Sequence, residues 1–286
     1  GYLFIDHNGN YLDRLERVGY KGRLFLIVLE STLIQPGNWL TENRNRYTAV
    51  FSWENPGKNR NIEDNDPILF FWPNPLSLAE KPIPFPEREK LCVLMAANKW
   101  KRRLGELYTE RFRAILWFME HHPEDFDLYG YDWDISTAKR IIEHVRNGYR
   151  SFKGTQVRPI DVSPVYRGSV PVKKDVIRRY RFCLCYENAH GFPGYVTEKI
   201  FDCFIAGVVP VYLGWDGISD YIPEETFINK KTYPTYESLY ERLVSIGEEE
   251  YQAYLDVIRS FLASEAAKKF DVSSFVEVLI EGMGLN

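Results

Sequence analysis

Residues 181–229 constrain the fold more than any other part of the chain. Residues 182–186 and 208–213 are apolar and include aromatic or β-branched side chains, as expected of strands covered on both faces. Residues 195–206 lie between them with apolar side chains at helical spacing, and Gly207 follows where a helix C-cap is expected. This order predicts a βαβ unit with parallel strands.

The loop and first helical turn of this unit carry polar residues that suit anion binding. Free backbone N–H groups and the helix dipole both favour an anion at a helix N-terminus. Lys199 opposes that dipole, which costs a few tenths to about 1 kcal/mol unless an anion compensates. Two interpretations remain open: a phosphate above the helix, or an ion pair of Lys199 with Glu198 or a neighbouring acid. For Glu187, a structural ion pair is as good an interpretation as a functional role.

The rest of the chain also alternates strands and helices, which predicts two α/β domains facing a cleft. The proline-dense residues 81–87 suggest a linker between them. We expect an N-terminal domain over residues 1–88, a C-terminal domain over 89–250 and a helical tail over 251–286. The expected strands are 23–29, 47–53, 68–72, 91–96 and 126–129, and the expected helices are 109–120, 236–246, 249–263 and 273–282.

Composition narrows the class of protein. With 286 residues, 45% hydrophobic and 27% charged, the chain resembles an ordinary soluble globular protein, and a net charge of −4 argues against a general nucleic-acid binder. The four cysteines form no CxxC pair and lie in apolar contexts, which predicts buried free thiols. Few cysteines and no N-x-S/T sequon favour a cytoplasmic location. No run of 18 apolar residues is present.

The phrases YEN, YVTEK, AGVVPVYLG and YIPEETFIN occur in this order within residues 186–229. They closely resemble the donor-site signature of the α-1,3-fucosyltransferases, glycosyltransferase family ten. Weaker similarities are Ala97-Asn98, Arg111-Phe112-Arg113, the FDLYG strand at 126–130 and the Leu29-Glu30-Ser31 phrase. The resemblance implies the GT-B fold, with two Rossmann-like domains and the donor nucleotide held mainly by the C-terminal domain. Because only 29 residues precede Glu30, fewer than the family usually has, we expect either a shortened N-terminal domain or a truncated chain.

The resemblance also implies roles for individual residues. A departing pyrophosphate needs cations and N–H donors aimed at its developing charge. Glu198 would hold the ribose hydroxyls, and Asn188 and Tyr195 would contact the phosphate and fucose. The full set of implied donor-binding residues is Asn98, Arg111, Asn188, Tyr195, Glu198 and Lys199, with Arg111 and Lys199 as the phosphate-binding cations.

The acceptor hydroxyl needs a general base on the opposite side of the cleft. By resemblance this base is Glu30, although Thr32 stands where the family has proline, and Glu54 is the rival candidate. The implied reaction is a single displacement with inversion. No divalent metal is expected to be required, because the family does not anchor its donor through a DxD motif. Asp132-Trp133-Asp134 has the DxD pattern. The alternative interpretation of these residues is a turn followed by a helix cap near Ser136.

The resulting hypothesis is an α-1,3/4-fucosyltransferase that uses GDP-fucose and a lactosamine-type acceptor containing GlcNAc. One alternative is a GT-B transferase for another nucleotide sugar. A second is a sugar-nucleotide or glycan-binding module without catalysis. The family is also compatible with peripheral membrane attachment through segments outside this sequence. If the natural chain carries an N-terminal anchor, the Golgi lumen is a further possible location.

Overall fold

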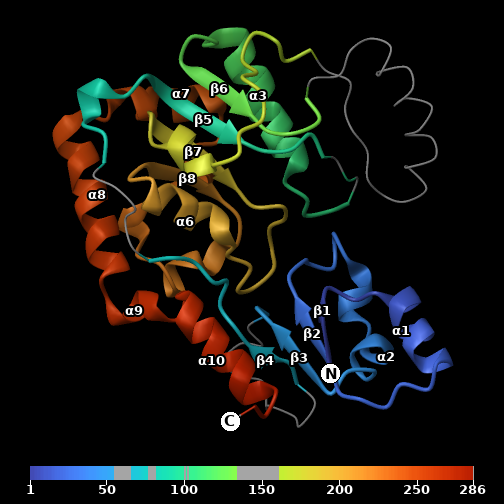
Figure 1. Cartoon of the computed structure of the whole chain (residues 1–286). Helices are drawn as coiled ribbons and strands as arrows, with labels where there is room; N and C mark the ends of the chain where they lie inside the picture. Colours follow the sequence, from blue (N-terminus) through green and yellow to red (C-terminus); the bar gives the residue numbers. More distant parts are fainter. Residues whose placement is uncertain (55–65, 77–81, 100, 102, 134–160, 286) are drawn as a thin grey trace.

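The computed structural model describes residues 1–54, 66–76, 82–99, 101, 103–133 and 161–285. They form two parallel β-sheets, each with its own helices (Figure 1). Parallel sheets need crossover connections and cover on both faces, as the alternating sequence pattern predicted. The expected α/β architecture with two parallel sheets is therefore confirmed.

The N-terminal sheet has the order β1-β2-β3-β4. Its strands are β1 (Tyr2–Ile5), β2 (Leu24–Val28), β3 (Ala49–Ser52) and β4 (Ile68–Leu69). Its helical segments are α1 (Gly9–Arg17), a 3-10 turn (Pro36–Trp39) and α2 (Thr41–Arg44). Helix α1 buries Leu12 and Leu15 in a cluster with Phe4 and Leu26, which attaches it to one face of the sheet. Neither β1 nor α1 was anticipated from the sequence.

The C-terminal sheet has the order β6-β5-β7-β8-β9. Its strands are β5 (Lys90–Met95), β6 (Phe126–Tyr129), β7 (Tyr180–Tyr186), β8 (Val209–Leu213) and β9 (Ile228–Asn229). The accompanying helices are α3 (Tyr108–His121), α5 (Lys173–Ile177), α6 (Glu198–Ile205), α7 (Tyr236–Ser245) and α8 (Glu248–Leu262). The strand order reverses between β5 and β7, and in open parallel sheets ligands bind at the carboxyl ends of strands beside such a reversal.

The last helices run from the C-terminal sheet back to the N-terminal sheet. After α9 (Glu265–Lys268), α10 (Val272–Gly282) lies against the N-terminal sheet (Figure 1). Phe275 packs on Phe70 with 5.2 Å between ring centroids, and Leu279 joins the same cluster beside Phe51. The C-terminal segment thus completes the core of the N-terminal sheet.

Helix α6 is shorter than its sequence pattern indicates. The expected start at Tyr195 is wrong, because the helix begins at Glu198 and Thr197 is its N-cap residue. Gly194 has φ +86°, a left-handed conformation that directs the following residues away from the helix axis. Tyr195 is thereby freed to point into the space between the sheets, where it is 1% exposed.

Two further expectations concern burial and membranes. All four cysteines are buried and free, as predicted. Among the residues described here, none of the helices combines the length and apolar character that crossing a membrane requires.

Candidate functional site

Glu187 is the central charged residue of the loop that follows β7. It is fully buried, and its carboxylate accepts hydrogen bonds from the Thr197 backbone N–H at 2.9 Å and the Thr197 hydroxyl at 2.7 Å. Helices leave their first N–H groups without intrahelical partners, and a carboxylate near them is stabilised by the helix dipole. Glu187 therefore caps α6 from the neighbouring strand.

Lys199 forms ion pairs with two carboxylates. Its Nζ lies 3.3 Å from Glu187 and 3.6 Å from Glu198, which supports the ion-pair interpretation of Lys199. Burial alone would lower the pKa of Lys199, but Glu187 and Glu198 outweigh it and raise the pKa. The Lys199 ammonium therefore remains charged, and its side chain as a whole keeps 23% exposure.

Glu198 stays ionised beside two lysines. Burial would raise the pKa of its carboxyl, whereas Lys199 and Lys173 lower it below the usual range. Lys173 Nζ lies 3.8 Å from Glu198 and 3.2 Å from Asp202. An acceptor-only carboxylate at the start of α6 is suited to holding sugar hydroxyls.

Arg111 reaches the end of β7 from α3. Its Nη2 donates to the Tyr186 carbonyl at 2.6 Å and to the Asn188 side-chain oxygen at 3.0 Å. The guanidinium also lies 5.1 Å from the centroid of the Tyr108 ring. These contacts fix a buried cation, 7% exposed, next to the polar loop. A planar guanidinium held in this way suits phosphate oxygens.

Tyr195 connects the two sheets. Asn188 Nδ2 donates to its hydroxyl at 3.4 Å, and that hydroxyl donates to Glu30 Oε2 at 3.4 Å. The Tyr195 ring packs on Trp53 with 4.7 Å between centroids. A continuous polar chain thus runs from Arg111 through Asn188 and Tyr195 to Glu30.

Glu30 follows β2 and faces the C-terminal sheet. Burial raises the pKa of its carboxyl and the charge of Asp6 raises it further, while Lys199, Lys99 and a hydrogen bond with Asn188 oppose them. A carboxylate with a raised pKa is a stronger base, which suits proton abstraction near neutral pH. The rival Glu54 is 39% exposed, and its carboxylate lies 3.8 Å from Arg44.

Asn98 lies outside this polar chain. It is 1% exposed, and its Nδ2 donates to the Asp132 carbonyl at 3.0 Å. Its backbone N–H donates to Tyr131, so it ties the loops after β5 and β6 together. The structure therefore brings Glu30, Arg111, Asn188, Tyr195 and Lys199 together, with Glu198 attached through Lys199, and places Asn98 in a loop-holding position.

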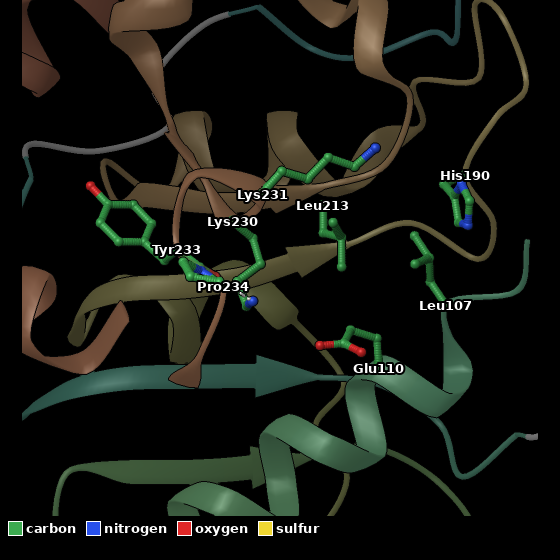
Figure 2. Close-up of a pocket in the computed structure, with 8 residues that line it drawn as sticks. All are labelled: Leu107, Glu110, His190, Leu213, Lys230, Lys231, Tyr233 and Pro234. Carbon is green, nitrogen blue, oxygen red and sulfur yellow. Dashed lines mark hydrogen bonds between the residues drawn. The ribbon is translucent and has the colours of Figure 1, made fainter. Parts of the chain in front are cut away.

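A cavity of about 320 Å³ opens beside this site on the α3 side of the sheet. Figure 2 shows side chains from α3, from the loop after β7 and from the segment after β9 arranged around it. Its charged groups have protein partners: Lys230 donates to the Tyr233 carbonyl at 2.9 Å, and Glu110 accepts from the Tyr236 hydroxyl at 2.8 Å. Neither Lys230 nor Glu110 was identified from the sequence. Lys230 directly follows β9, and Glu110 lies in the first turn of α3.

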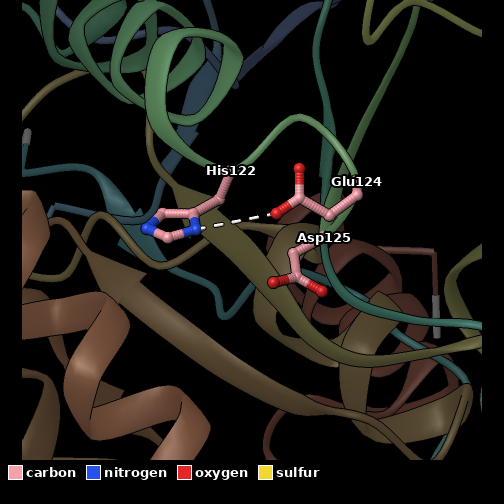
Figure 3. Close-up of side chains that lie close together, drawn as sticks. All are labelled: His122, Glu124 and Asp125. Carbon is pink, nitrogen blue, oxygen red and sulfur yellow. Dashed lines mark ion pairs between the residues drawn. The ribbon is translucent and has the colours of Figure 1, made fainter.

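One group of possible metal ligands, His122, Glu124 and Asp125, lies in the turn between α3 and β6 (Figure 3). This turn is at the amino edge of the C-terminal sheet, opposite the polar chain. His122 stacks on the Tyr240 ring at 3.6 Å, and the Tyr240 hydroxyl donates to Asp125 at 2.7 Å. Contacts with Tyr240 thus account for the placement of His122 and Asp125, while Glu124 is 69% exposed and lies 3.8 Å from His122.

The expected turn at Asp132-Trp133-Asp134 is described only in part. Asp132 has φ +66°, and Trp133 is buried with its indole N–H donating to the Ala96 carbonyl at 2.6 Å. Asp134 and Ser136 lie outside the described residues.

The two parallel sheets have the arrangement of the GT-B fold. The fold is similar to that of the solved structure of TarM, with a TM-score of 0.52 and 10% identity over 96% of this chain and 54% of that one. Residues 160–275 match the family described as "Glycosyltransferase family 10 (fucosyltransferase) C-term". This match covers less than half of the chain, and it confirms the resemblance found in the motifs.

Curated relatives match over a shorter stretch. Alpha-(1,3)-fucosyltransferase FucT of Helicobacter pylori is 29% identical over 90 residues, which are 32% of this chain and 18% of that protein. GDP-fucose protein O-fucosyltransferase 3 of Gallus gallus is 32% identical over 84 residues, which are 28% of this chain and 18% of that protein. The matches thus span less than a fifth of the length of either relative.

Proposed function

We propose that this protein is an inverting fucosyltransferase that moves fucose from GDP-fucose to a hydroxyl of a GlcNAc-containing glycan, in an α-1,3 or α-1,4 linkage. The observation that carries the proposal is the polar chain from Arg111 to Glu30. It places a buried cation on one sheet and a carboxylate of raised pKa on the other, joined through Tyr195. A group-transfer enzyme needs a cation for the leaving group on one side of the reacting carbon and a base for the acceptor on the other.

On the donor side, Arg111 and Lys199 would bind the diphosphate. Both are charged side chains in a largely water-excluded place, where electrostatic interactions are stronger than in water. A bound diphosphate would share Lys199 with Glu187 and Glu198, so its negative charge is partly offset by a cation already in position. Glu198 would accept hydrogen bonds from the ribose hydroxyls, and Asn188 and Tyr195 would contact the phosphate and fucose.

On the acceptor side, Glu30 would take the proton from the acceptor hydroxyl. The acceptor oxygen then forms a bond to the anomeric carbon as the bond from that carbon to the β-phosphate oxygen breaks. The electron pair of the broken bond leaves with GDP, whose charge Arg111 and Lys199 stabilise. A single displacement of this kind inverts the anomeric configuration.

We also propose that the reaction needs no divalent metal. Arg111 and Lys199 supply positive charge at the place where an enzyme of another design would use a metal ion. Transfer in excess EDTA should equal transfer in added Mg²⁺ or Mn²⁺. Loss of activity in EDTA that either metal restores would contradict this part of the proposal.

A protein hydroxyl is a second candidate acceptor. It is favoured by the match to a GDP-fucose protein O-fucosyltransferase, which is of similar strength to the match with Alpha-(1,3)-fucosyltransferase FucT. Both candidates share the donor and the base, so they differ only in what occupies the acceptor side.

The decisive experiment measures GDP release from GDP-fucose with lactosamine, with a serine- and threonine-containing peptide, and with buffer alone. GDP release that depends on lactosamine supports a glycan acceptor. GDP release that depends on the peptide supports a protein hydroxyl as the acceptor. Binding of GDP without release in any arm would instead favour a module without catalysis. A thermal-shift comparison of GDP, UDP, CDP and ADP tests the donor, and stabilisation by UDP but not GDP would overturn the fucose assignment.

A further inference from the structure

Asp6 holds the backbone on the N-terminal side of Glu30. It follows β1, and its Oδ1 accepts hydrogen bonds from the Leu29 backbone N–H at 2.9 Å and the Glu30 backbone N–H at 3.1 Å. The same oxygen accepts from Asn38 Nδ2 at 2.7 Å. One carboxylate oxygen of Asp6 therefore accepts three hydrogen bonds near the end of β2.

The C-terminal side of Glu30 is held as firmly. Its carbonyl accepts from Asn38 Nδ2 at 3.2 Å and from the Trp39 indole N–H at 3.1 Å. Asn38 is fully buried, and its own Oδ1 accepts from the His7 backbone N–H at 2.6 Å. Both backbone polar groups of Glu30 are thus bound by side chains, which leaves its carboxylate free to face Tyr195.

The backbone of Asp6 is in an uncommon conformation. Its φ is +59°, in the left-handed region that non-glycine residues adopt rarely and aspartate and asparagine most readily. Its N–H donates to the Ile27 carbonyl at 2.9 Å, so this conformation is anchored to β2. Such local strain persists when the surrounding structure determines it and is often found at functional sites.

We propose that Asp6 is a positioning residue for the general base Glu30: it directs the Glu30 carboxylate toward Tyr195 and places a second negative charge near it. This inference rests on the proposed function, since it assigns Glu30 the role of base. A peptide segment held through both its N–H and its carbonyl keeps its side chain within a narrow range of directions, as a near-attack geometry requires.

Several charged and titratable groups face Glu30 from the surrounding elements. Asp6 approaches from the end of β1 and opposes ionisation of Glu30, while Lys199 from α6 and Lys99 from the loop after β5 favour it. Within the described part of the chain, Lys101, Tyr108 and Tyr195 also interact with Glu30. Removing the charge of Asp6 should therefore make Glu30 easier to ionise and a weaker base.

Two substitutions of Asp6 separate its charge from its hydrogen bonds. Asp6→Asn keeps an acceptor oxygen, suits the left-handed conformation and removes only the charge. Asp6→Ala removes all three hydrogen bonds. Asp13→Asn is the matched control, because Asp13 is an exposed carboxylate of the same sheet region that pairs with Arg46. Each variant is assayed for transfer from GDP-fucose between pH 5 and 9, for GDP affinity and for melting temperature.

We expect Asp6→Ala to lower kcat by about 10²-fold at pH 7.5 with GDP affinity close to that of the native protein. In Asp6→Asn the acid limb of kcat/KM should move to lower pH, and Asp13→Asn should leave both quantities unchanged. An unshifted acid limb in Asp6→Asn, or a kcat in Asp6→Ala equal to that of the native protein, would overturn the inference. A loss of kcat together with GDP affinity and melting temperature would also overturn it, because that result indicates a purely structural role.

Glu30→Gln in the same assays distinguishes this inference from the proposed function. If Glu30→Gln keeps full transfer activity, Glu30 is not the base and the proposed mechanism fails whatever Asp6 does. If Glu30→Gln abolishes transfer while both Asp6 variants behave as the native protein, only the positioning role fails.

Discussion

The hydroxyl of Tyr195 lies 3.4 Å from Oε2 of Glu30, although the two residues are 165 positions apart in the chain. This contact joins the loop before α6 to the end of β2. It brings the carboxylate on one sheet next to the polar loop of the other, where Asn188 and Arg111 continue the hydrogen-bonded chain. The site is therefore assembled only when both sheets are in place.

Tyr195→Phe should reduce transfer without unfolding the protein. The substitution removes the hydroxyl that bridges Glu30 and Asn188 but keeps the ring that packs on Trp53. Because a hydrogen bond contributes about 0.5–1.5 kcal/mol net, kcat/KM should fall by up to about tenfold. Tyr11→Phe, at an exposed tyrosine, is the control. A Tyr195→Phe enzyme as active as the native one would show that the bridge has no part in the reaction.

Glu30→Gln should stabilise the protein at neutral pH. Folding raises the pKa of Glu30, mainly through burial, so its contribution to stability is complete below the unfolded pKa and decreases as the pH rises through the folded value. Replacing the carboxylate by a neutral amide removes this decrease in stability at higher pH. The melting temperature of Glu30→Gln should exceed that of the native protein at pH 7.5 and match it near pH 4.

The control for this measurement is Glu241→Gln, at an exposed position of α7. It should leave the melting temperature unchanged at both pH values. A lower melting temperature for Glu30→Gln at pH 7.5 would mean that ionised Glu30 stabilises the fold, contrary to the direction of its pKa shift.

Lys199→Ala should weaken both GDP binding and the fold. It leaves Glu187 buried and without its cation, which should cost about 2–3 kcal/mol of folding free energy, less than in a fully buried pair because Lys199 keeps 23% exposure. The double variant Glu187→Gln/Lys199→Ala should recover part of this stability. GDP affinity, measured by calorimetry, should stay low in both variants.

This double-mutant cycle separates two roles of Lys199. If the double variant regains GDP affinity together with stability, Lys199 acts only as the partner of Glu187. If stability returns and affinity does not, Lys199 contacts the nucleotide itself.

Arg111→Lys should weaken GDP binding although it keeps the charge. Arg111 Nη2 serves two acceptors at once, the Tyr186 carbonyl and the Asn188 side chain, and a lysine ammonium lacks the planar geometry to hold both and still face a phosphate. Hydrogen bonds to charged groups contribute about 1.5–3 kcal/mol each, so GDP affinity should fall by at least about tenfold. Arg113→Lys is the control, because Arg113 lies on the same helix and is 68% exposed. Equal affinity in the two variants would exclude a role for the guanidinium of Arg111.

The parallel strands and crossover helix around α6 could be predicted because their signals are local. The apolar runs of β7 and β8, and Gly207 with φ +67° at the end of the helix, each depend on neighbouring residues. The start of α6 was predicted three residues too early, because Tyr195 has an apolar ring at the right spacing for a helix. Its burial between the sheets, rather than helix propensity, determines its conformation.

The N-terminal strand and helix escaped prediction for a different reason. Residues 2–5 form a short strand with only Phe4 buried, so no apolar alternation distinguishes β1 from a loop. Its place in the sheet comes from pairing with β2, in which Ile5 is opposite Ile27. Without β1, the role of Asp6 at the end of that strand could not be inferred.

The sequence by itself determined the local elements, the motif residues and the apolar surroundings of the four cysteines, because periodicity, glycine positions and the spacing of residues within a βαβ unit act over short distances. Only the tertiary structure decided which partners the charged residues have. Glu187 caps α6 and pairs with Lys199, Asp6 stands behind Glu30, and α10 completes the core of the N-terminal sheet. The pKa of a buried charged group and the orientation of its side chain depend on residues that are distant in the chain. The packing of the two sheets therefore determines the chemistry of the site.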